Sequence, residues 1–284
     1  MARRILVAGA TGYLGGFVVG ELKRRGYVVR ALGRSRAKLH RLQEAPDECV
    51  EAEVTRPETL DGVCREVDVV FSSVGITRQR DGLTFRDVDY QGNLNLFQAA
   101  LREGVKRFIY VSAFNGARLR HLDIAAAHED FVDELKASGM DYTVIRPTGY
   151  FSDMGEILDM ARRGSAWLIG SGRNRVNPIH GADLAEVCAD AIEGGETEID
   201  VGGPEVVTWN EAAELAFAAL GRPPRIRHFP PWLMWSVVRV VRLFSRHQGE
   251  LLAFFATMAT TDVVAPSTGV HRLGDYYRAI AGER

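Results

Sequence analysis

Three evenly spaced glycines carry the clearest chemical signal in this chain of 284 residues. They lie in Gly9-Ala10-Thr11-Gly12-Tyr13-Leu14-Gly15, between an apolar run and a segment of helical periodicity. Glycines let the backbone approach a phosphate closely, and the amino end of the following helix offers N–H groups and a positive dipole. A tight strand-to-helix turn without a ligand is the alternative. Because the loop opens a strand–helix–strand unit, we predict that it binds the phosphates of a nucleotide.

The residues after the second expected strand indicate which nucleotide binds. A site for NAD commonly places an acidic residue about 20 residues beyond the loop, where it accepts hydrogen bonds from the ribose 2′-OH. No acidic residue lies between Glu21 and Glu44, and the strand is followed by Arg34-Ser35-Arg36. Guanidinium groups suit a 2′-phosphate, although Arg36 also fits a solvated helix start. We therefore predict NADP rather than NAD, with Arg34 and Ser35 at the 2′-phosphate.

Apolar runs and helical periodicities alternate through the first half of the chain and would position this loop. Strands are expected at residues 5–8, 27–32, 49–53, 68–74, 107–112 and 142–146. Helices are expected at residues 13–25, 56–66, 84–103 and 122–138. Strands separated by helices form parallel sheets, which bind ligands at the carboxyl ends of the strands. The predicted fold class is α/β, a doubly wound parallel sheet.

The alternation ends near Arg146-Pro147. Helical segments then follow at residues 155–163, 182–193 and 210–220, joined by short pieces that contain glycine and proline. We predict a nucleotide-binding domain at residues 1–150 and a smaller, mainly helical substrate lobe at residues 151–284. Within the second range, residues of about 176–203 are expected to return to the first domain.

Composition excludes several classes of protein. The 35 Lys and Arg residues nearly balance the 37 Asp and Glu residues, which argues against binding nucleic acid through bulk charge. The three cysteines form no Cys-x-x-Cys pair and the seven histidines show no metal-ligand spacing, so we predict no metal site and a reducing compartment. Glycines from Gly9 onward interrupt the first apolar run too early for a signal peptide. We expect a cytoplasmic protein, with peripheral attachment to a membrane as an alternative.

The glycine loop and four further segments resemble sequences of the atypical branch of the short-chain dehydrogenase/reductase superfamily, including its NmrA-like and extended-type members. They are Val88-Asp89-Tyr90-Gln91-Gly92-Asn93, Tyr110-Val111-Ser112-Ala113, Arg146-Pro147-Thr148-Gly149 and Asn177-Pro178-Ile179-His180-Gly181-Ala182-Asp183. The resemblance implies a Rossmann domain that holds NADP across the strand ends. It implies these contacts: Glu53 and Val54 at the adenine, Ser73, Val74 and Gly75 at the ribose, and Pro147, Thr148, Gly149, Tyr150 and Phe151 at the nicotinamide. Val111, Ser112 and His128 complete the predicted cofactor site.

The usual catalytic pair of this superfamily, Tyr-x-x-x-Lys, is missing. None of the eight tyrosines is followed four residues later by lysine, and the two positions in the expected helix hold Ile124 and His128. His128 could donate a hydrogen bond to the ribose or protonate a substrate near neutral pH. A packed histidine with satisfied hydrogen bonds is the alternative.

Tyr150 and Ser112 are two further catalytic candidates. Tyr150 could present its phenol to the substrate or pack at the lobe boundary. Ser112 ends a strand, where it could donate to a carbonyl of the substrate or satisfy the backbone. In the loop after the fourth strand, Arg78, Arg80 and Arg86 favour either an anionic ligand or a solvated loop.

Two apolar helical segments lie near the carboxyl terminus, at residues 232–246 and 251–259. The first carries one narrow polar stripe of Ser236, Arg239, Arg242 and Arg246. Neither segment is long enough to span a bilayer. They could lie on a membrane surface with arginines toward anionic head groups, form a dimer face, line an apolar substrate tunnel, or be buried on the nucleotide-binding core.

Three functions follow from these patterns. We favour an NADPH-dependent reductase of an apolar carbonyl, enone or quinone-type small molecule, since the cofactor delivers the hydride and the protein mainly orients it. The second is a non-catalytic NADP-binding regulator or sensor, which the missing catalytic pair would explain. The third is a membrane-associated assembly protein that uses residues 232–260 as its contact.

Overall fold

The computed structural model describes residues 2–76 and 82–282. The chain forms two compact units, of which the first contains residues 1–146 and 184–199. The second contains residues 147–183 and 200–284.

A seven-stranded sheet organises the first unit, with the strand order β3-β2-β1-β4-β5-β6-β9. Its strands are β1 (Arg4–Ala8), β2 (Val28–Gly33), β3 (Glu48–Glu51), β4 (Val69–Ser72), β5 (Arg107–Val111), β6 (Asp141–Pro147) and β9 (Glu198–Val201). Val7 of β1 pairs in parallel with Ala31 of β2 on one side and with Phe71 of β4 on the other. Strands β2 and β3 lie on one side of β1, and β4, β5 and β6 lie on the other, so the strand order reverses between β1 and β4. At such a reversal, ligands bind outside the carboxyl ends of the strands. The predicted doubly wound parallel sheet is confirmed.

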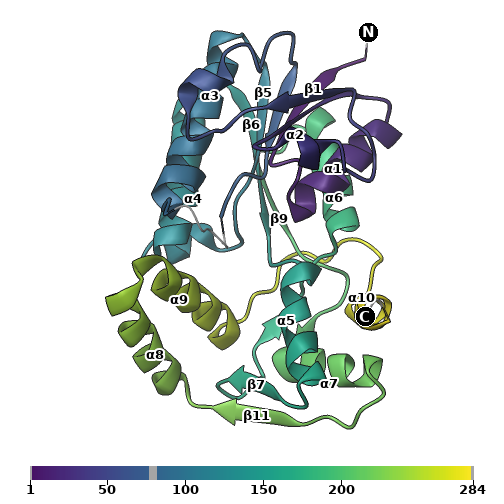
Figure 1. The fold of residues 1–284 in the computed structure, drawn as a ribbon, viewed down its shortest axis with the longest axis vertical. Helices are drawn as coiled ribbons and strands as arrows, with labels where there is room; N and C mark the ends of the chain where they lie inside the picture. The colour runs from purple at the N-terminus through teal and green to yellow at the C-terminus, as the bar shows by residue number, and fades with distance from the viewer. Residues whose placement is uncertain (1, 77–81, 283–284) are drawn as a thin grey trace. The chain divides into compact units, whose positions relative to one another are not determined.

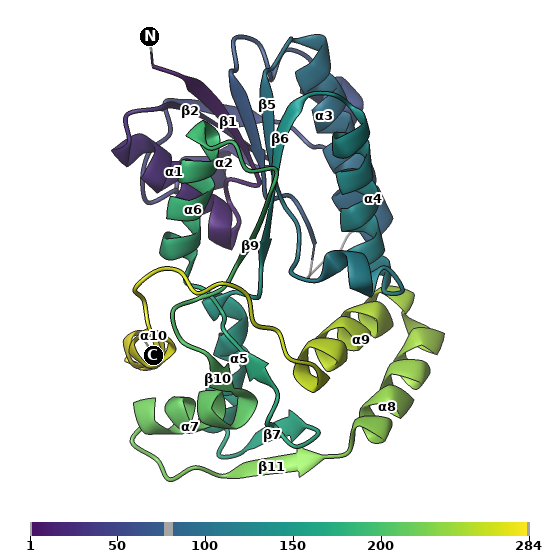
Figure 2. The same cartoon turned by 180° about the vertical axis from the view of Figure 1, so that it is seen from behind.

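Helices cover both faces of this sheet. The two views agree that α3 (Asn93–Arg102) and α4 (Asp123–Ala137) lie on one face, with α1 (Tyr13–Arg24) and α6 (Gly181–Glu193) on the other (Figures 1 and 2). Edge-to-face aromatic pairs pack α3 and α4 against β5, with ring centroids 4.7 to 6.2 Å apart. The rings belong to Phe97, Phe108, Tyr110 and Phe131.

One sequence-based prediction is wrong in this unit. The helix expected at residues 56–66 is only a short 3-10 helix, η1 (Pro57–Leu60). Gly62 and Glu66 adopt left-handed backbone conformations, with φ of 71° and 58°, which interrupt an α-helix. The helix expected at residues 84–103 begins instead as a π-helix, η2 (Arg86–Gly92), and continues as α3.

The second unit is mainly helical. Its apolar core lies among α5 (Phe151–Arg162), α7 (Trp209–Ala219) and α10 (Leu273–Ala281), with β7 (Ala166–Ile169) and β11 (Ile226–Phe229) paired in parallel beside them. A second small pair joins β8 (Arg175–Val176) to β10 (Val207–Thr208), and α8 (Pro231–Phe244) and α9 (Arg246–Thr260) follow. Within residues 2–76 and 82–282, no helix combines the length and the apolar composition that a membrane crossing requires.

Candidate functional site

The glycine loop between β1 and α1 has a backbone that larger residues could not adopt. Gly9 lies in the left-handed region with φ of 81°, and its carbonyl accepts the N–H of Gly12 at 2.9 Å. A Cβ atom on Gly15 would lie 2.1 Å from the carbonyl oxygen of Gly9. Gly15 therefore lets the first turn of α1 press directly against the loop, as close helix–strand packing at a phosphate site requires.

The amino end of α1 is suited to an anion. The helix begins at Tyr13 after Gly12, and no acidic residue lies in its first turn. Thr11 and Gly12, which precede this turn, are exposed, and the first N–H groups of an α-helix lack partners within the helix and favour an anion. A Cβ atom on Gly33 would lie 3.4 Å from Thr11 Cγ2, which places the end of β2 beside the loop. Arg34, the next residue, is exposed at that strand end.

The loop after β4 also contacts the glycine loop. A Cβ atom on Gly9 would lie 3.0 Å from Ser73 Oγ. Two buried side chains four residues apart, Asp89 and Asn93, hold this loop in place. Asn93 Nδ2 donates to the Val74 carbonyl at 3.1 Å, and the Asp89 carboxylate accepts the N–H of Ile76 at 3.3 Å. Residues after β1, β2 and β4 therefore meet at one edge of the sheet, where the sequence predicted the nucleotide.

The residues predicted at the adenine follow β3. The Val54 carbonyl accepts Asn95 Nδ2 at 2.9 Å, which ties this segment to α3. The Glu53 N–H donates to Thr59 Oγ1 at 3.0 Å, and its carboxylate pairs with Arg56 at 3.3 Å. These contacts fix the backbone of Glu53 and Val54 just beyond the carboxyl end of β3.

His128 lies on α4 within a chain of hydrogen bonds. Its Nδ1 lies 2.5 Å from the Tyr110 hydroxyl and its Nε2 lies 3.1 Å from Asp89 Oδ1. The side chain of His128 is 14% exposed, whereas Asp89 and Tyr110 are fully buried. Burial raises the pKa of the Asp89 carboxyl, and the hydrogen bond from His128 opposes that rise. A Cβ atom on Gly75 would lie 3.5 Å from His128 Cε1, so the imidazole also packs against the loop after β4.

The sequence identified His128 but missed its two partners as members of a site. Asp89 and Tyr110 lie in segments quoted for the family resemblance, 39 and 18 residues away from His128 along the chain. A buried tyrosine at a strand end and an aspartate in the segment before α3 were the available signals.

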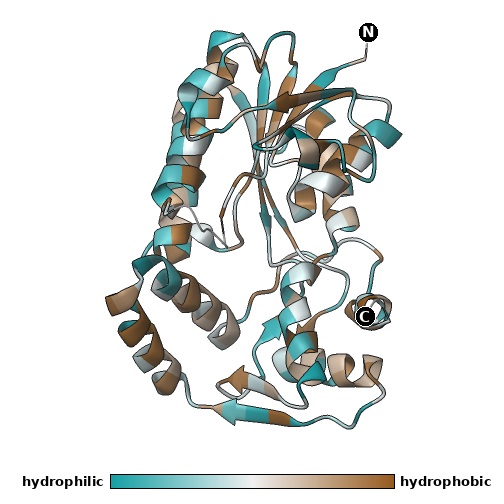
Figure 3. Cartoon of the chain, viewed as in Figure 1, coloured by the Kyte–Doolittle hydropathy of each residue, from teal (hydrophilic) through white to brown (hydrophobic). Residues whose placement is uncertain are grey.

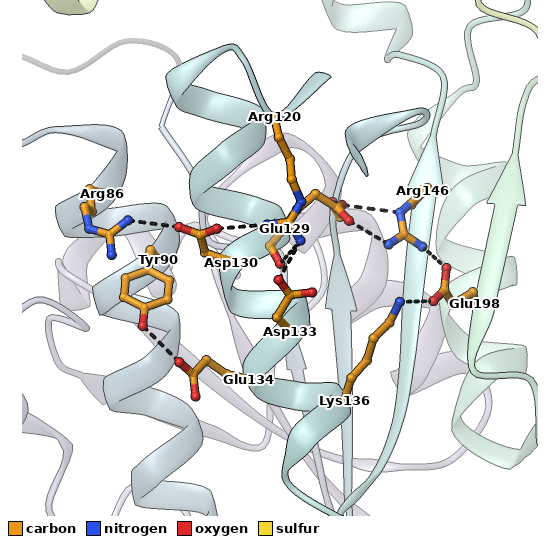
Figure 4. Close-up of polar contacts among 11 residues, drawn as sticks. Arg86, Tyr90, Arg120, Glu129, Asp130, Asp133, Glu134, Lys136, Arg146 and Glu198 are labelled. Atoms are coloured by element: carbon orange, nitrogen blue, oxygen red, sulfur yellow. Dashed lines mark hydrogen bonds and ion pairs between the residues drawn. The ribbon is translucent and has the colours of Figure 1, made fainter. Parts of the chain in front are cut away.

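Ser112 donates to Glu129, which belongs to a network of ion pairs whose inner pair is buried. Figure 4 shows Glu129, Arg146, Glu198 and Lys136 of this network. The Ser112 hydroxyl donates to Glu129 Oε1 at 2.7 Å, and Glu129 pairs with Arg146 at 3.0 Å. Arg146 also pairs with Glu198 at 2.6 Å, which in turn binds Lys136 at 2.5 Å. This network connects α4 to β6 and β9 and fixes the helix that carries His128. The Ser112 hydroxyl is therefore directed at a carboxylate of the protein.

A second group of ion pairs connects α4 to the π-helix (Figure 4). Arg86 pairs with Asp130 at 3.0 Å, and Arg120 pairs with the same carboxylate at 3.0 Å. Arg86 thus holds α4 in place, while the loop arginines Arg78 and Arg80 lie outside the described residues.

The segment predicted at the nicotinamide belongs largely to the second unit. Thr148 Oγ1 donates to the Asn177 carbonyl at 2.6 Å, and the Phe151 N–H donates to the Ile179 carbonyl at 3.1 Å. Phe151 is buried against His180, with ring centroids 5.6 Å apart, and Tyr150 directly precedes α5. Among residues 2–76 and 82–282, no group of three His, Cys, Asp or Glu residues is arranged to hold a metal ion.

Comparison with known proteins decides the class. A family model described as NAD(P)H-binding matches residues 9–194, which is more than half of the chain. The chain belongs to this NAD(P)H-binding family. Its membership confirms the predicted likeness to NAD(P)-binding Rossmann proteins of the atypical dehydrogenase/reductase class, and it agrees with a dinucleotide at the glycine loop.

Individual relatives of this NAD(P)H-binding protein include reductases and an assembly factor. The chain is 32% identical to divinyl chlorophyllide a 8-vinyl-reductase of Zea mays over 84% of its own length, and it spans 64% of the length of that enzyme. It is 28% identical to the photosystem II assembly factor Ycf39 of Synechocystis sp., covering 90% of this chain and 80% of that protein. The structure resembles the NADPH-dependent quinone oxidoreductase QOR2 of Escherichia coli with a TM-score of 0.77 and 20% identity, covering 97% of this chain and 99% of that one. At that identity the last likeness concerns the fold.

Proposed function

We propose that this protein is an NADPH-dependent reductase of an apolar carbonyl, enone or quinone-type small molecule. The observation that carries the proposal is that the glycine loop lies beside the end of β2, where Arg34 is exposed. The loop suits a pyrophosphate, and a guanidinium beside it suits the 2′-phosphate that distinguishes NADP from NAD.

The residues fit the group that they would hold. Gly9, Gly12 and Gly15 let the loop pack closely against the amino end of α1, and the first turn of α1 places no carboxylate there to repel a pyrophosphate. In the proposal, the backbone of Ser73 and Gly75 follows the ribose beyond that point. The bound nicotinamide would supply the hydride.

The protein's own contribution is mainly orientation. In the neutral imidazole of His128, one nitrogen donates and the other accepts, so Asp89 and Tyr110 can satisfy both. We assign His128 the role of holding the Gly75 backbone in place, while its two ring nitrogens bind Asp89 and Tyr110. Orientation of two reactants can lower a barrier by about 7–11 kcal/mol, which gives a reductase without the Tyr-x-x-x-Lys pair a source of rate.

The relatives support this class of reaction. The maize relative is named as a vinyl reductase and the Escherichia coli structure as an NADPH-dependent quinone oxidoreductase. The name of the maize relative describes reduction of a vinyl group, in agreement with an unsaturated substrate.

A second candidate is a non-catalytic NADP-binding protein that regulates or assists assembly. Two observations favour it. His128 and Ser112 both direct their polar atoms at other residues of the protein. A relative named as an assembly factor matches 90% of this chain.

Steady-state oxidation of NADPH separates the two candidates. The purified protein would be given NADPH with 1,4-naphthoquinone, with a long-chain α,β-unsaturated ketone, or with neither. We expect NADPH loss that requires both the protein and one substrate, and a lower kcat per folded molecule in the His128→Ala variant. If folded protein binds NADPH yet consumes none across a broad panel of enones and quinones, the reductase proposal fails and the second candidate stands.

A further inference from the structure

The α8 helix exposes a continuous apolar face. Leu233, Val237, Val240 and Phe244 follow one another at helical spacing and are exposed by 42%, 42%, 54% and 87%. Trp232 and Leu243 extend the same face and are exposed by 67% and 83%. Figure 3 shows α8 coloured as hydrophobic over most of its length. An exposed apolar patch of this kind usually marks a contact with a partner or a membrane.

The opposite side of α8 is occupied by α9. Val238 is buried there, and a Cβ atom on Gly249 would lie 2.3 Å from Arg242 Cγ, so the two helices touch closely. Arg242 pairs with Glu250 of α9 at 2.9 Å, and Ser245 ends α8 and caps α9 by accepting the N–H of Gln248. These contacts between α8 and α9 involve the inner side of α8 and not its outer apolar face.

This arrangement corrects the predicted polar stripe. Arg242 is turned to α9, and α8 ends at Phe244, so Arg246 belongs to the next helix. The seam between α8 and α9 is buried, whereas the outer face of α8 is exposed.

The stretch of sequence that contains α8 is rich in arginine. Arg239 and Arg242 lie on α8 and Arg246 begins α9, whereas Arg222 donates to carbonyls at the end of α5. Residues 222–250 contain one acidic residue, Glu250, and that residue pairs with Arg242. The same range contains six arginines, namely Arg222, Arg225, Arg227, Arg239, Arg242 and Arg246. The difference is five positive charges in a chain whose formal net charge is -2. Arg239 and Arg246 are exposed next to the apolar face.

We propose that the outer face of α8 docks on the surface of an anionic lipid bilayer, with the helix axis parallel to the membrane. An α-helix of 14 residues is about 21 Å long, which is shorter than the roughly 30 Å hydrocarbon core and fits an in-plane position. Apolar side chains would enter the interface, Trp232 would lie at head-group depth, and arginines would meet lipid phosphates.

The charges disfavour a second copy of this chain as the occupant. A two-fold contact places the same patch on both sides of the interface. Arg239 and Arg246 would then face a patch with the same arginines, and the acidic residue nearest in sequence, Glu250, already pairs with Arg242. An anionic surface has no such repulsion.

Co-sedimentation with vesicles tests the proposal. The full chain would be mixed with vesicles of phosphatidylglycerol and phosphatidylcholine, or of phosphatidylcholine alone. We expect binding to the anionic vesicles that weakens as salt rises. The Leu243→Asp/Phe244→Asp variant should lose it, and each replacement of Arg239 or Arg246 by Gln should weaken it about five-fold.

Matched changes elsewhere serve as controls. Leu101→Asp alters a half-exposed leucine on α3, and Arg173→Gln alters an exposed arginine between β7 and β8; neither should change vesicle binding. Equal binding of the α8 variants and the wild type would overturn the proposal. So would the absence of vesicle binding together with a dimer, seen by sedimentation velocity, that Leu243→Asp abolishes. No nucleotide is needed, so this test is independent of the reductase proposal.

Discussion

Removing Arg146 should strongly destabilise the first unit, because it would leave a buried carboxylate without its cation. Glu129 is 2% exposed, and the guanidinium of Arg146 contacts it through Nε at 3.4 Å and Nη2 at 3.0 Å. After Arg146→Ala, only the Ser112 hydroxyl would still donate to this carboxylate among the hydrogen bonds described. Breaking a buried pair from one side costs about 3–5 kcal/mol. We expect a loss of that size in the free energy of unfolding of the first unit.

Hydrogen–deuterium exchange resolved by peptide is the appropriate assay. All four tryptophans lie in the second unit, so their fluorescence would not report on this change. Amides of β5, β6 and α4 should exchange about 100-fold to 4000-fold faster in the variant, since each 1.4 kcal/mol is about a factor of ten.

Two comparison variants make the test specific. Glu198→Gln removes a 42% exposed partner of Arg146 and should cost about 1 kcal/mol or less. The double variant Glu129→Leu/Arg146→Met replaces the buried pair with apolar groups and should be more stable than Arg146→Ala. An Arg146→Ala protein within about 1 kcal/mol of the wild type would refute this reasoning about the buried pair.

Two further predictions concern the glycine loop and the second unit. Gly15→Ala would place a methyl group 2.1 Å from the Gly9 carbonyl oxygen and should weaken nucleotide binding at least about ten-fold, whereas Gly16→Ala, whose Cβ would meet nothing nearer than 4.0 Å, should bind normally in the same calorimetric titration. Burial lowers the pKa of His180 below its ordinary 6.5, and its Nδ1 accepts the Ala182 N–H at 3.2 Å. Just below pH 6.5 the unfolded chain therefore binds more protons than the folded chain. The free energy of unfolding should fall as the pH drops through that range. Urea unfolding followed by tryptophan fluorescence should show a smaller loss of unfolding free energy on acidification in His180→Asn than in the wild type. An equal dependence of unfolding free energy on pH in the two proteins would count against this assignment.

Local patterns predicted the first strand–loop–helix unit well. The apolar run before Gly9 and the periodicity after Gly12 depend on neighbouring residues, and Gly15 must be glycine because of an atom six residues away. The doubly wound parallel sheet followed from the alternation of strands and helices. The helix expected at residues 56–66 failed because apolar spacing does not reveal a left-handed residue such as Glu66.

The polar site and the exposed helix face required the structure. Asp89, Tyr110 and His128 come from three elements, and only the packing of α4 against β5 and η2 brings them together. Periodicity also identified an apolar face on residues 232–246, but it could not tell whether that face is covered. Apolar residues surround most of α8 in sequence, and α9 covers one side of the helix.

Calorimetric titration with NADPH, NADP⁺, NADH and NAD⁺ measures directly whether the glycine loop and Arg34 bind a 2′-phosphorylated nucleotide. We expect tighter binding of the two 2′-phosphorylated nucleotides, and Arg34→Ala should weaken only these, by about 10-fold to 100-fold for the loss of charge-assisted hydrogen bonds. Arg102→Ala, at an exposed arginine where α3 ends, should leave all four affinities unchanged. Equal affinity for all four nucleotides, or no binding to folded protein, would show that the predicted NADP site is wrong.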